Sequence, residues 1–516
     1  MKIIYLTLCL LLMASVSWAQ EWTEIKGKVM RATDKTPIES ARVWSADAKK
    51  SVVTDQKGEF IIQVNKKHTT LLFESYLYLS KEVPVNGREQ LEVYLLDVNT
   101  PAFHPEHTLP LGQVNHYDRT GNPFSRGLKD LNNAKPFLDE TLYGTIPGVQ
   151  ALEKSGMPGE GAYLNLRGIR SLSANNAPLI VVDGLPLLPD MEESPVISGY
   201  SKNILMPVSL KDVRSFTFVQ GADAAMYGSM GSNGVLLIET DKASDMETKV
   251  EFQTINGLTW MNKRYPMLDA DGFKSYLVDV GETKVANTNE LVALFPFLKD
   301  DYDYQHYYRH IYGNNTDWQD EIYNQCAFST ENILKVKGGD EIAKYNLTAG
   351  YLRNNGVVKN TDLSKYYTRL NADLNVSAKV KMSASFGFSY VQSHLQEQGM
   401  IPQTNPLLAA LYKAPVLGVW EKDMYGNRVS RFDTVRQFGI SNPRAVVEQV
   451  EATMKTYDIL GNIALNYQPN TKFNFDAMLG IYYNYNSENL FVPGKSQPSI
   501  APLMDGYAHN TVRGGV

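Results

Sequence analysis

Apolar and polar residues alternate strictly along several segments in the C-terminal half of the chain. In residues 380–390 every even position is apolar, aromatic or alanine, and every odd position is polar or glycine. The same period of two occurs in residues 366–376, 457–467 and 473–483, and more weakly in 250–260 and 345–351. Such a period places one kind of side chain on each face of a β-strand. A strand of about ten residues crosses the hydrocarbon of a bilayer when it is tilted by about 45°.

Two interpretations of these strands compete. A soluble antiparallel sandwich is the first, but its strands are usually nearer five or six residues long. A transmembrane barrel wall is the second, and the tyrosines favour it, because 21 of the 30 follow residue 250 and aromatic residues collect at the girdles of a barrel. The mean hydropathy of -0.28 agrees with such a wall, since only alternate residues meet lipid. We therefore expect a membrane-spanning antiparallel sheet.

The first 19 residues are expected to be a secretory signal peptide. Lys2 precedes an apolar run from residue 3 to 16, and Ser17, Trp18 and Ala19 form a small-residue cleavage site before Gln20. Removing this segment deletes one lysine, which changes the formal charge from -6 to -7 (-6 − 1). A mildly acidic chain argues against a nucleic-acid partner. Cys326 is then the one remaining cysteine, so no disulfide can form between residues 20 and 516.

Two blocks rich in glycine and short apolar runs precede the alternating segments. In residues 162–184, two short strands, Tyr163–Leu166 and Leu179–Val182, flank a loop rich in Ser and Asn, and the second strand stops at Asp183-Gly184. Residues 210–240 are expected to form a strand, a short helical turn, a glycine-rich bend and another apolar strand. Between residues 137 and 152 we expect a short helix over 137–146 and a strand over 149–152.

These blocks resemble the plug domain of TonB-dependent outer-membrane transporters of the SusC/RagA-like branch. The resemblance is carried by the runs Asn-Leu-Arg-Gly-Ile-Arg-Ser at 165–171, Pro-Leu-Ile-Val-Val-Asp-Gly-Leu-Pro at 178–186, and Tyr-Gly-Ser-Met-Gly-Ser-Asn-Gly-Val at 227–235. It implies that the motif residues either hold the plug in its wall or gate a ligand. These residues are Arg167, Gly168, Arg170, Asp183, Gly184, Tyr227, Gly228, Asn233 and Gly234.

Residues 24–96 resemble the carboxypeptidase-regulatory-like domain, a β-sandwich of about seven strands that is not catalytic. Short strands are expected at 24–31, 41–46, 59–64, 69–73 and 90–95. The chain is thus expected to be mainly β, with five parts: signal peptide 1–19, sandwich 20–97, linker 98–129, plug 130–245 and partial transmembrane β-barrel 246–516. A ring that encloses such a plug needs about 22 strands. About seven are visible, so the 516 residues are expected to be the N-terminal part of a longer transporter or a truncated product.

The resemblance implies TonB-dependent uptake across the outer membrane of oligosaccharides or oligopeptides. It also implies a SusD-like surface lipoprotein as partner, TonB with its inner-membrane complex as energy source, and a periplasmic N-terminal domain. A Val-rich TonB-contacting box is not visible between sandwich and plug. Its absence permits a surface receptor that does not transport. A siderophore or haem receptor is a separate alternative. No enzyme activity, cofactor or metal site is expected, because no nucleophile–base or metal constellation stands out.

Two further clusters have ambiguous meaning. The first is an aromatic cluster that is able to stack on sugar rings or to form an interfacial girdle. It consists of Tyr302, Tyr304, Tyr307, Tyr308, Tyr312 and Trp318. Asp300, Asp301 and Asp303 offer oxygen ligands for calcium, but the regular ligand spacing is missing.

Overall fold

The computed structural model describes residues 22–515 with gaps. The gaps are 33–34, 46–50, 66–69, 77, 79, 86–87, 96–105, 110–111, 116–123, 128–134, 145–147, 174, 188–194, 243–245, 286–287, 299–306, 341, 378, 436–438, 471–472, 495–498 and 501–505. The expected signal peptide lies outside the described residues. The chain divides into two compact units, residues 1–120 and 121–516.

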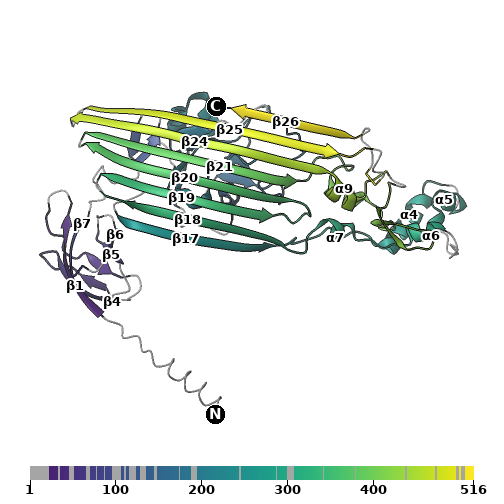
Figure 1. Ribbon diagram of the computed structural model, residues 1–516, viewed down its shortest axis with the longest axis horizontal. Coiled ribbons are helices and arrows are strands. Elements are labelled where there is room, and N and C mark those ends of the chain that lie inside the picture. The colour runs from purple at the N-terminus through teal and green to yellow at the C-terminus, as the bar shows by residue number, and fades with distance from the viewer. Residues whose placement is uncertain are drawn as a thin grey trace, which may run out of the picture. The chain divides into compact units, whose positions relative to one another are not determined.

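The first unit contains a two-layer β-sandwich (Figure 1). One sheet has the order β4-β1-β7 and the other β3-β2-β5-β6. The strands are β1 (Trp22–Arg31), β2 (Arg42–Trp44), β3 (Ser51–Val53), β4 (Glu59–Asn65), β5 (Thr70–Glu74), β6 (Lys81–Pro84) and β7 (Gln90–Leu95). Alternate residues such as Phe60, Ile62 and Val64 are buried between the layers, because successive side chains of a strand point to opposite faces. Strands β3 and β6 escaped the sequence analysis because three and four residues are too few to show a period of two.

The segment expected to be a linker contains regular structure. Strands β8 (Glu106–Leu109) and β9 (Gly112–Asn115) form an antiparallel hairpin. Strand β10 (Phe124–Gly127) pairs with a strand of the following domain. These strands lack the apolar alternation that marks a buried strand, and they pair through backbone groups, which any sequence supplies.

The second unit begins with a small α/β domain, hereafter the plug (residues 124–242). Its five-stranded sheet has the order β10-β15-β16-β13-β14, and a separate pair joins β11 to β12. The elements are α2 (Leu138–Thr141), β11 (Val149–Leu152), β12 (Tyr163–Leu166), β13 (Leu179–Val182), β14 (Leu185–Leu187), η4 (Leu210–Asp212), β15 (Val213–Val219), α3 (Ala222–Ala225), η5 (Gly228–Asn233) and β16 (Val235–Thr240). All four residues of β13 are buried, as its uninterrupted apolar run predicts.

Helix α2 is much shorter than the helix expected over residues 137–146. It covers Leu138–Thr141. Gly144 has a φ of 69°, a left-handed conformation that ends a right-handed helix. The structure thus corrects this element, whereas β11, β12 and β13 have the expected bounds.

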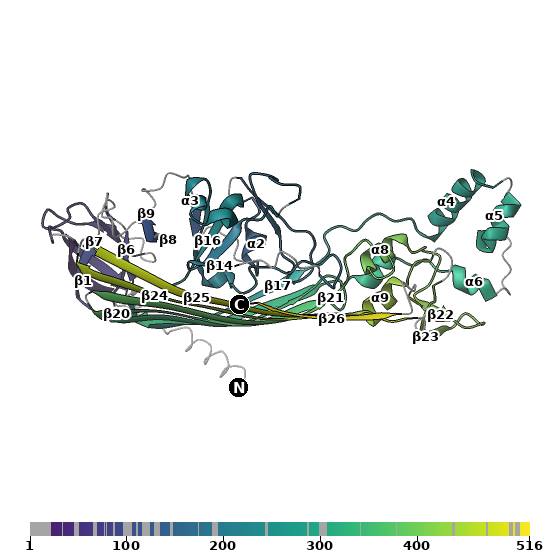
Figure 2. The ribbon, with the colours of Figure 1, turned by 90° about the horizontal axis from the view of Figure 1, so that it is seen from above.

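An eight-stranded antiparallel sheet, hereafter the long sheet, follows the plug. Its order is β17-β18-β19-β20-β21-β24-β25-β26. The strands are β17 (Met246–Thr259), β18 (Ala327–Gly339), β19 (Ala343–Asn355), β20 (Asp362–Ser377), β21 (Val380–Leu395), β24 (Glu451–Asn470), β25 (Phe473–Val492) and β26 (Tyr507–Gly515). Figure 2 shows the plug against one face of this sheet, which we call the inward face.

The two ends of the long sheet carry different connections. At one end the connections are short: β18 ends at Gly339 and β19 begins at Ala343, β20 ends at Ser377 and β21 begins at Val380, and β24 ends at Asn470 and β25 begins at Phe473. At the other end long loops carry α4 (Ala270–Glu282), α5 (Thr288–Leu294), η6 (Pro296–Leu298), α6 (Tyr307–Tyr312), α7 (Trp318–Ile322), α8 (Pro406–Tyr412), β22 (Trp420–Lys422), β23 (Arg428–Phe432) and α9 (Pro443–Gln449) (Figure 1). Short turns face the periplasm and long loops face outside in bacterial barrels.

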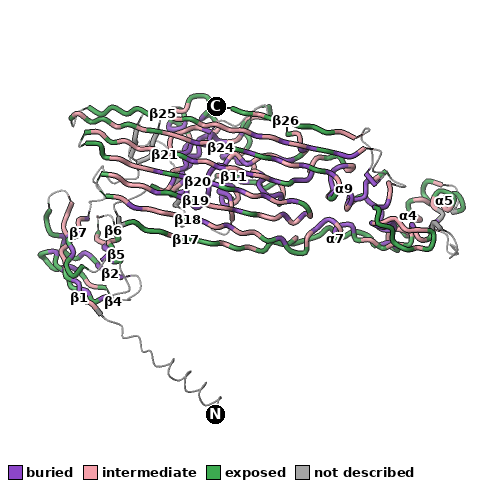
Figure 3. The backbone as a smooth tube through the Cα atoms, in the orientation of Figure 1, coloured by how far each residue is buried: buried purple, intermediate pink, exposed green. Residues whose placement is uncertain are grey.

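The outward face of the long sheet is apolar and bordered by aromatic rings. Buried and more exposed residues alternate along much of β20 (Figure 3), and the inward residues are the buried ones. Five tyrosines form a row across neighbouring strands, with ring centroids 4.8, 6.3, 4.7 and 5.8 Å apart: Tyr351, Tyr366, Tyr390, Tyr457 and Tyr485. Nearer the short turns, Tyr467 stacks on Phe475 at 6.2 Å.

The spacing of these aromatic residues matches the thickness of a membrane. Tyr457 and Tyr467 lie ten residues apart on β24 (467 − 457), or about 33 Å along a strand that rises about 3.3 Å per residue. At a tilt of about 45° this is about 23 Å of height, close to the apolar band of about 25 Å on bacterial barrels. Separately, no helix among the described residues is long and apolar enough to cross a bilayer, a finding that concerns helices alone.

Two strands of the long sheet were not foreseen. In β18, Ile333 is buried on the inward face beside the outward Leu334, so the apolar–polar alternation is broken there. In β26 polar and glycine residues occupy both faces. The mainly β fold, with a plug beside a large antiparallel sheet, is nevertheless the one expected.

Candidate functional site

The plug meets the long sheet through a network of buried polar groups centred on Asp183. The two-residue turn Asp183-Gly184 joins β13 to β14, and both residues have positive φ, 47° and 86°. Two such residues make the type I′ hairpin turn, for which Asp-Gly is a preferred sequence. The turn places the Asp183 side chain at the end of the buried β13.

The Asp183 carboxylate joins the end of β13 to β16 within the plug and also contacts the wall. Its Oδ1 accepts a hydrogen bond from the Thr240 backbone N–H at 2.9 Å, and its Oδ2 accepts one from the Thr240 hydroxyl at 2.7 Å. Arg369 on β20 lies with Nη1 3.8 Å from Asp183 Oδ2. The Asn462 side chain on β24 donates to the Asp183 carbonyl at 2.8 Å. One residue therefore contacts two strands of the long sheet.

Neighbouring plug residues extend this network toward β18 and β19. The Lys337 ammonium donates to Asp241 Oδ2 at 2.6 Å, and Lys335 lies 3.6 Å from Asp241 and 3.9 Å from Asp212. The Asp241 carbonyl accepts hydrogen bonds from the side chains of Asn346 at 2.5 Å and Asn371 at 2.9 Å. We call these residues, with Asp183, Thr240, Arg369 and Asn462, the Asp183 network.

The burial of the Asp183 network determines its energetic role. The side chains of Asp183, Arg369 and Asp212 are 8%, 4% and 2% exposed. Removing one member of a buried ion pair leaves an uncompensated charge, which costs about 3–5 kcal/mol. The network therefore resists separation of the plug from the long sheet while all its members are present.

The other motif residues hold the two plug blocks against each other. Arg170 donates through Nη1 to the Ser232 carbonyl at 2.7 Å, and the Asn233 side chain donates to the Asn175 carbonyl at 2.6 Å. Gly234 has a φ of 92°, and a Cβ there would lie 2.4 Å from Leu166 Cδ1, so only glycine fits. Tyr227 N–H donates to the Ala224 carbonyl at 3.1 Å.

The structure separates the three charged residues that the sequence analysis grouped. Asp183 reaches the wall, Arg170 bonds within the plug, and Arg167 has an exposed side chain. Arg167 and Gly168 have positive φ values of 58° and 93°, and the Arg167 N–H donates to the Gly148 carbonyl at 2.7 Å. Gly228, with a φ of 64°, begins η5.

Sequence reasoning did not identify most wall partners of the plug. The missed wall residues are Lys335, Lys337, Asn346 and Asn462, and the plug residues that they or Asp183 contact, Asp212, Thr240 and Asp241, were missed as well. A usable signal was present, because the period of two in residues 366–376 puts Arg369 and Asn371 together on the polar face of their strand. Polar residues on the inward face of a spanning strand face either water or a plug, and sequence alone does not distinguish these.

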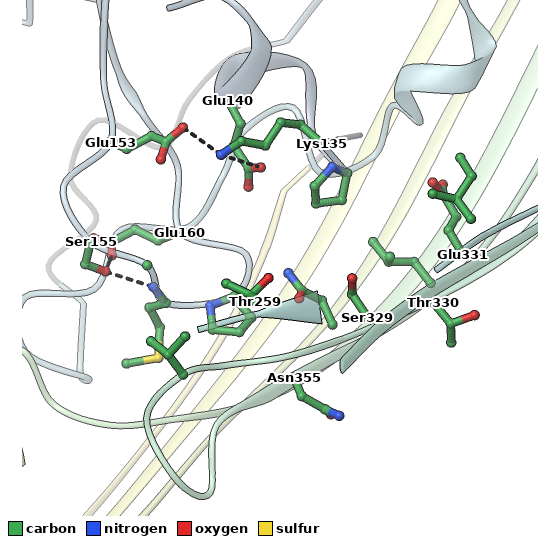
Figure 4. A pocket seen from close by; sticks show the side chains of 18 of the residues that line it. Lys135, Glu140, Glu153, Ser155, Glu160, Thr259, Ser329, Thr330, Glu331 and Asn355 are labelled. Atoms are coloured by element: carbon green, nitrogen blue, oxygen red, sulfur yellow. Dashed lines mark hydrogen bonds and ion pairs between the residues drawn. The ribbon is translucent and has the colours of Figure 1, made fainter. Parts of the chain in front are cut away.

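A cavity of about 340 Å³ lies between the plug and strands β17–β19. Its plug side includes residues 153–160, and its wall side includes Thr259, Ser329, Glu331 and Asn354 (Figure 4). At its rim Lys135 Nζ lies 3.3 Å from Glu153 and 3.9 Å from Glu140 (Figure 4). The wall residues lie toward the long-loop ends of their strands.

Glu140 is the titratable group of this cavity that burial perturbs most clearly. The pKa of Glu140 is raised to about 8, chiefly by burial and next by the adjacent Asp139 carboxylate, while Lys135 opposes the rise. Its side chain is 18% exposed. At neutral pH the protonated form of Glu140 therefore predominates in the folded protein.

The raised pKa of Glu140 predicts that the free energy of unfolding depends on pH. Because its folded pKa exceeds its ordinary value of 4.5, its stabilising contribution is full below about pH 4.5 and is lost as the pH rises to about 8. We expect the free energy of unfolding to fall by up to about 1.4 kcal/mol per pH unit in this window. Urea unfolding at several pH values should show that Glu140→Gln removes this slope. The exposed Glu282→Gln on α4 is the control, and a slope that survives in Glu140→Gln contradicts the assignment.

The aromatic and acidic clusters are only partly visible. Tyr302, Tyr304, Asp300, Asp301 and Asp303 lie outside the described residues. Among the rest, Tyr312 stacks on Phe297 at 4.6 Å, and Trp318 is buried and donates to the Ala414 carbonyl at 3.0 Å. Both pack inside the loop region. In the part of the chain that the structure describes, no group of three or more His, Cys, Asp or Glu side chains is placed to hold a metal ion.

Comparisons with known proteins agree with this architecture. Residues 130–235 match the TonB-dependent receptor plug domain, and residues 25–101 match the CarboxypepD_reg-like domain. The TonB-dependent receptor SusC of Bacteroides thetaiotaomicron is 25% identical over 523 residues, covering 98% of this chain and 48% of SusC. The TonB-dependent receptor P26 of Formosa agariphila is 26% identical over 477 residues, covering 91% of this chain and 44% of that receptor. The chain thus spans about half the length of these relatives.

Solved structures show the same fold. The RagAB peptide importer in its open-open state superposes with a TM-score of 0.61 at 17% identity, covering 78% of this chain and 44% of that chain. Another structure of the RagAB peptide transporter gives a TM-score of 0.58 at 17% identity, covering 76% of this chain and 44% of that chain. This protein therefore carries a CarboxypepD_reg-like domain and a TonB-dependent receptor plug domain, and along nearly its whole length it is similar to SusC-like TonB-dependent receptors.

Proposed function

We propose that the chain takes part in TonB-dependent import of oligosaccharides or oligopeptides across the outer membrane. One observation carries the proposal: the plug is bound by buried charges to the inward face of a sheet whose outward face is apolar and bordered by tyrosines. An apolar outward face suits a wall that contacts lipid. A plug bound to the inward face suits a passage that opens when the plug moves. The similarity to SusC-like receptors supports nutrients as the cargo class.

The parts of the chain take distinct roles in this proposal. Residues 20–97 form a periplasmic sandwich, 98–129 connect it to the plug, 130–245 are the plug, and 246–516 contribute to the barrel wall. The long loops on the outer side meet a SusD-like surface lipoprotein, and TonB supplies energy from the periplasmic side. The motif residues Arg167, Gly168, Arg170, Tyr227, Gly228, Asn233 and Gly234 keep the plug folded, whereas Asp183 anchors it. In this proposal the protein acts without enzymatic chemistry.

Gene deletion tests the proposed function. Growth of the deletion strain on defined glycans and peptides as nutrient sources should fall for one polymer class and recover when the gene is restored. A defect confined to iron-chelate uptake would support the siderophore or haem alternative. Unchanged growth on every polymer would support the surface receptor that does not transport.

A further inference from the structure

We propose that cargo passes the plug on the side of strands β17–β19, through the cavity beside residues 153–160, while the side of β21–β25 stays closed. This inference rests on the proposed import function and adds the route. It follows from an asymmetry in how the plug packs against the wall.

On the closed side, the long loops, the plug and the wall share one apolar core. Ile197 and Tyr200 of the plug pack in a cluster with α7, α8 and α9 and with wall residues Ala452, Met454 and Leu490. Ile197 and Met454 have no exposed surface and Tyr200 has 1%. Separating such a cluster exposes apolar surface at about 25 cal/mol per Å², so this boundary opposes opening.

Backbone contacts reinforce the closed side. The Gln398 N–H donates to the Ser198 carbonyl at 2.8 Å, which ties the plug to the loop after β21. Gly199 has a φ of 80°, and a Cβ there would lie 2.5 Å from the Gln398 carbonyl carbon. On β25, Glu488 Oε2 accepts from the Val196 N–H at 2.8 Å. The plug segment 196–199 therefore lies too close to β25 and to the loop after β21 for cargo to pass between them.

Lower on the same side, the plug sheet rests directly on the wall. Leu460 on β24 belongs to the apolar core of the plug, and Tyr482 on β25 packs against it. A Cβ at Gly480 would lie 2.7 Å from Leu185 Cδ1 of β14. This contact closes the boundary from the middle of the plug to the Asp183 turn.

The β17–β19 side differs in chemistry as well as in space. Among the described residues, its lining combines hydroxyl, amide and charged groups with the apolar side chains of Met157, Ile255, Leu352 and Val357, and includes no aromatic ring. Beside the largely protonated Glu140, three further glutamates face two lysines there: Glu153, Glu160 and Glu331, with Lys135 and Lys154. Such a lining exchanges hydrogen bonds with a polar chain and repels an anionic one.

An apolar cluster between plug and wall adjoins the cavity. Phe137 and Met206 of the plug pack there against Leu352, Leu363 and Val391, and Leu352 also lines the cavity. This small cluster separates the cavity from the Asp183 network. A passage that continues past this cluster also requires the contacts of Lys335 and Lys337 with Asp241 to break.

Single cysteines test the route in the full-length protein in cells, in a Cys326→Ser background because Cys326 is exposed. Ser329→Cys places a thiol in the cavity, Ala452→Cys places one in the closed core, and Ser430→Cys on exposed β23 is the control. The probe is a maleimide that carries a polyethylene glycol chain. Labelling at Ser329→Cys should exceed that at Ala452→Cys by more than about tenfold, since a buried site reacts only on opening.

Uptake of the nutrient that supports the parent strain is then measured after labelling. Modified Ser329→Cys should lose at least about nine-tenths of its uptake rate, and modified Ser430→Cys should keep it. Full uptake by labelled Ser329→Cys, or rapid labelling of Ala452→Cys in actively importing cells, would overturn the route. An unlabelled parent without uptake refutes the import function itself, which is a separate result.

Discussion

Replacing Arg369 by methionine is expected to destabilise the docked plug by about 3–5 kcal/mol, because it leaves the buried Asp183 carboxylate without its cation. Arg369 Nη1 lies 3.8 Å from Asp183 Oδ2, and the two side chains are 4% and 8% exposed. Urea-driven release of the plug, followed by protease cleavage of plug residues in the folded protein, measures this loss. The midpoint should shift to lower urea with no change in the cleavage pattern.

The chain offers a matched control for this substitution. Arg353 Nη2 lies 3.7 Å from Asp362 Oδ2, nearly the same separation, but the side chains are 50% and 26% exposed. Arg353→Met should therefore cost at most about 1 kcal/mol. In an Asp183→Asn background, Arg369→Met should cost much less, because no unpaired carboxylate remains. Equal losses for Arg369→Met and Arg353→Met would contradict the anchoring role of the pair.

Arginine on the outward face of the long sheet should destabilise the protein according to its depth. Leu370 lies between the two aromatic levels of the wall, is 43% exposed, and neighbours Leu347 and Phe386. Leu370→Arg should cost about 2–4 kcal/mol in a bilayer, as arginine does at the midplane of a barrel. Tyr366→Arg, in the row of tyrosines, should cost about 0–1 kcal/mol for its charge.

Folding into lipid vesicles from urea measures both values. Leu370→Ala separates the lost packing from the added charge, and the same substitutions in detergent-free buffer show whether lipid is involved. If Leu370→Arg and Tyr366→Arg cost the same amount, the outward face does not lie across a bilayer.

Local sequence patterns predicted the strands in which each face has the same surroundings along its whole length. The alternation in residues 380–390 identified β21 and its two faces, and the apolar run Leu179–Val182 identified β13. Asp183-Gly184 predicted its turn because few sequences tolerate two positive φ values. Strand β10 went unseen, because pairing at a sheet edge requires backbone groups rather than a side-chain pattern.

The sequence predicted the candidate site only at Asp183, which both ends a buried strand and contacts the wall. Asp183 stood out because it ends a buried strand, and it proved to meet Arg369. Lys337 and Asp241 are more than ninety residues apart and adjoin through the fold alone (337 − 241 = 96). No local pattern pairs them, because the sequence around either charged residue is equally compatible with a solvent-exposed side chain. The cavity likewise arises from segments separated along the chain, residues 153–160 and three strands.

The central claim is that the outward face of the long sheet contacts lipid while the inward face holds the plug. Spin labels on cysteines at the outward positions 368, 370 and 372 of β20, in the full-length protein in bilayers, test it most directly. Collisions with lipid-soluble oxygen should exceed those with a water-soluble nickel chelate at all three positions. Stronger collisions with the nickel chelate at these positions would contradict the account.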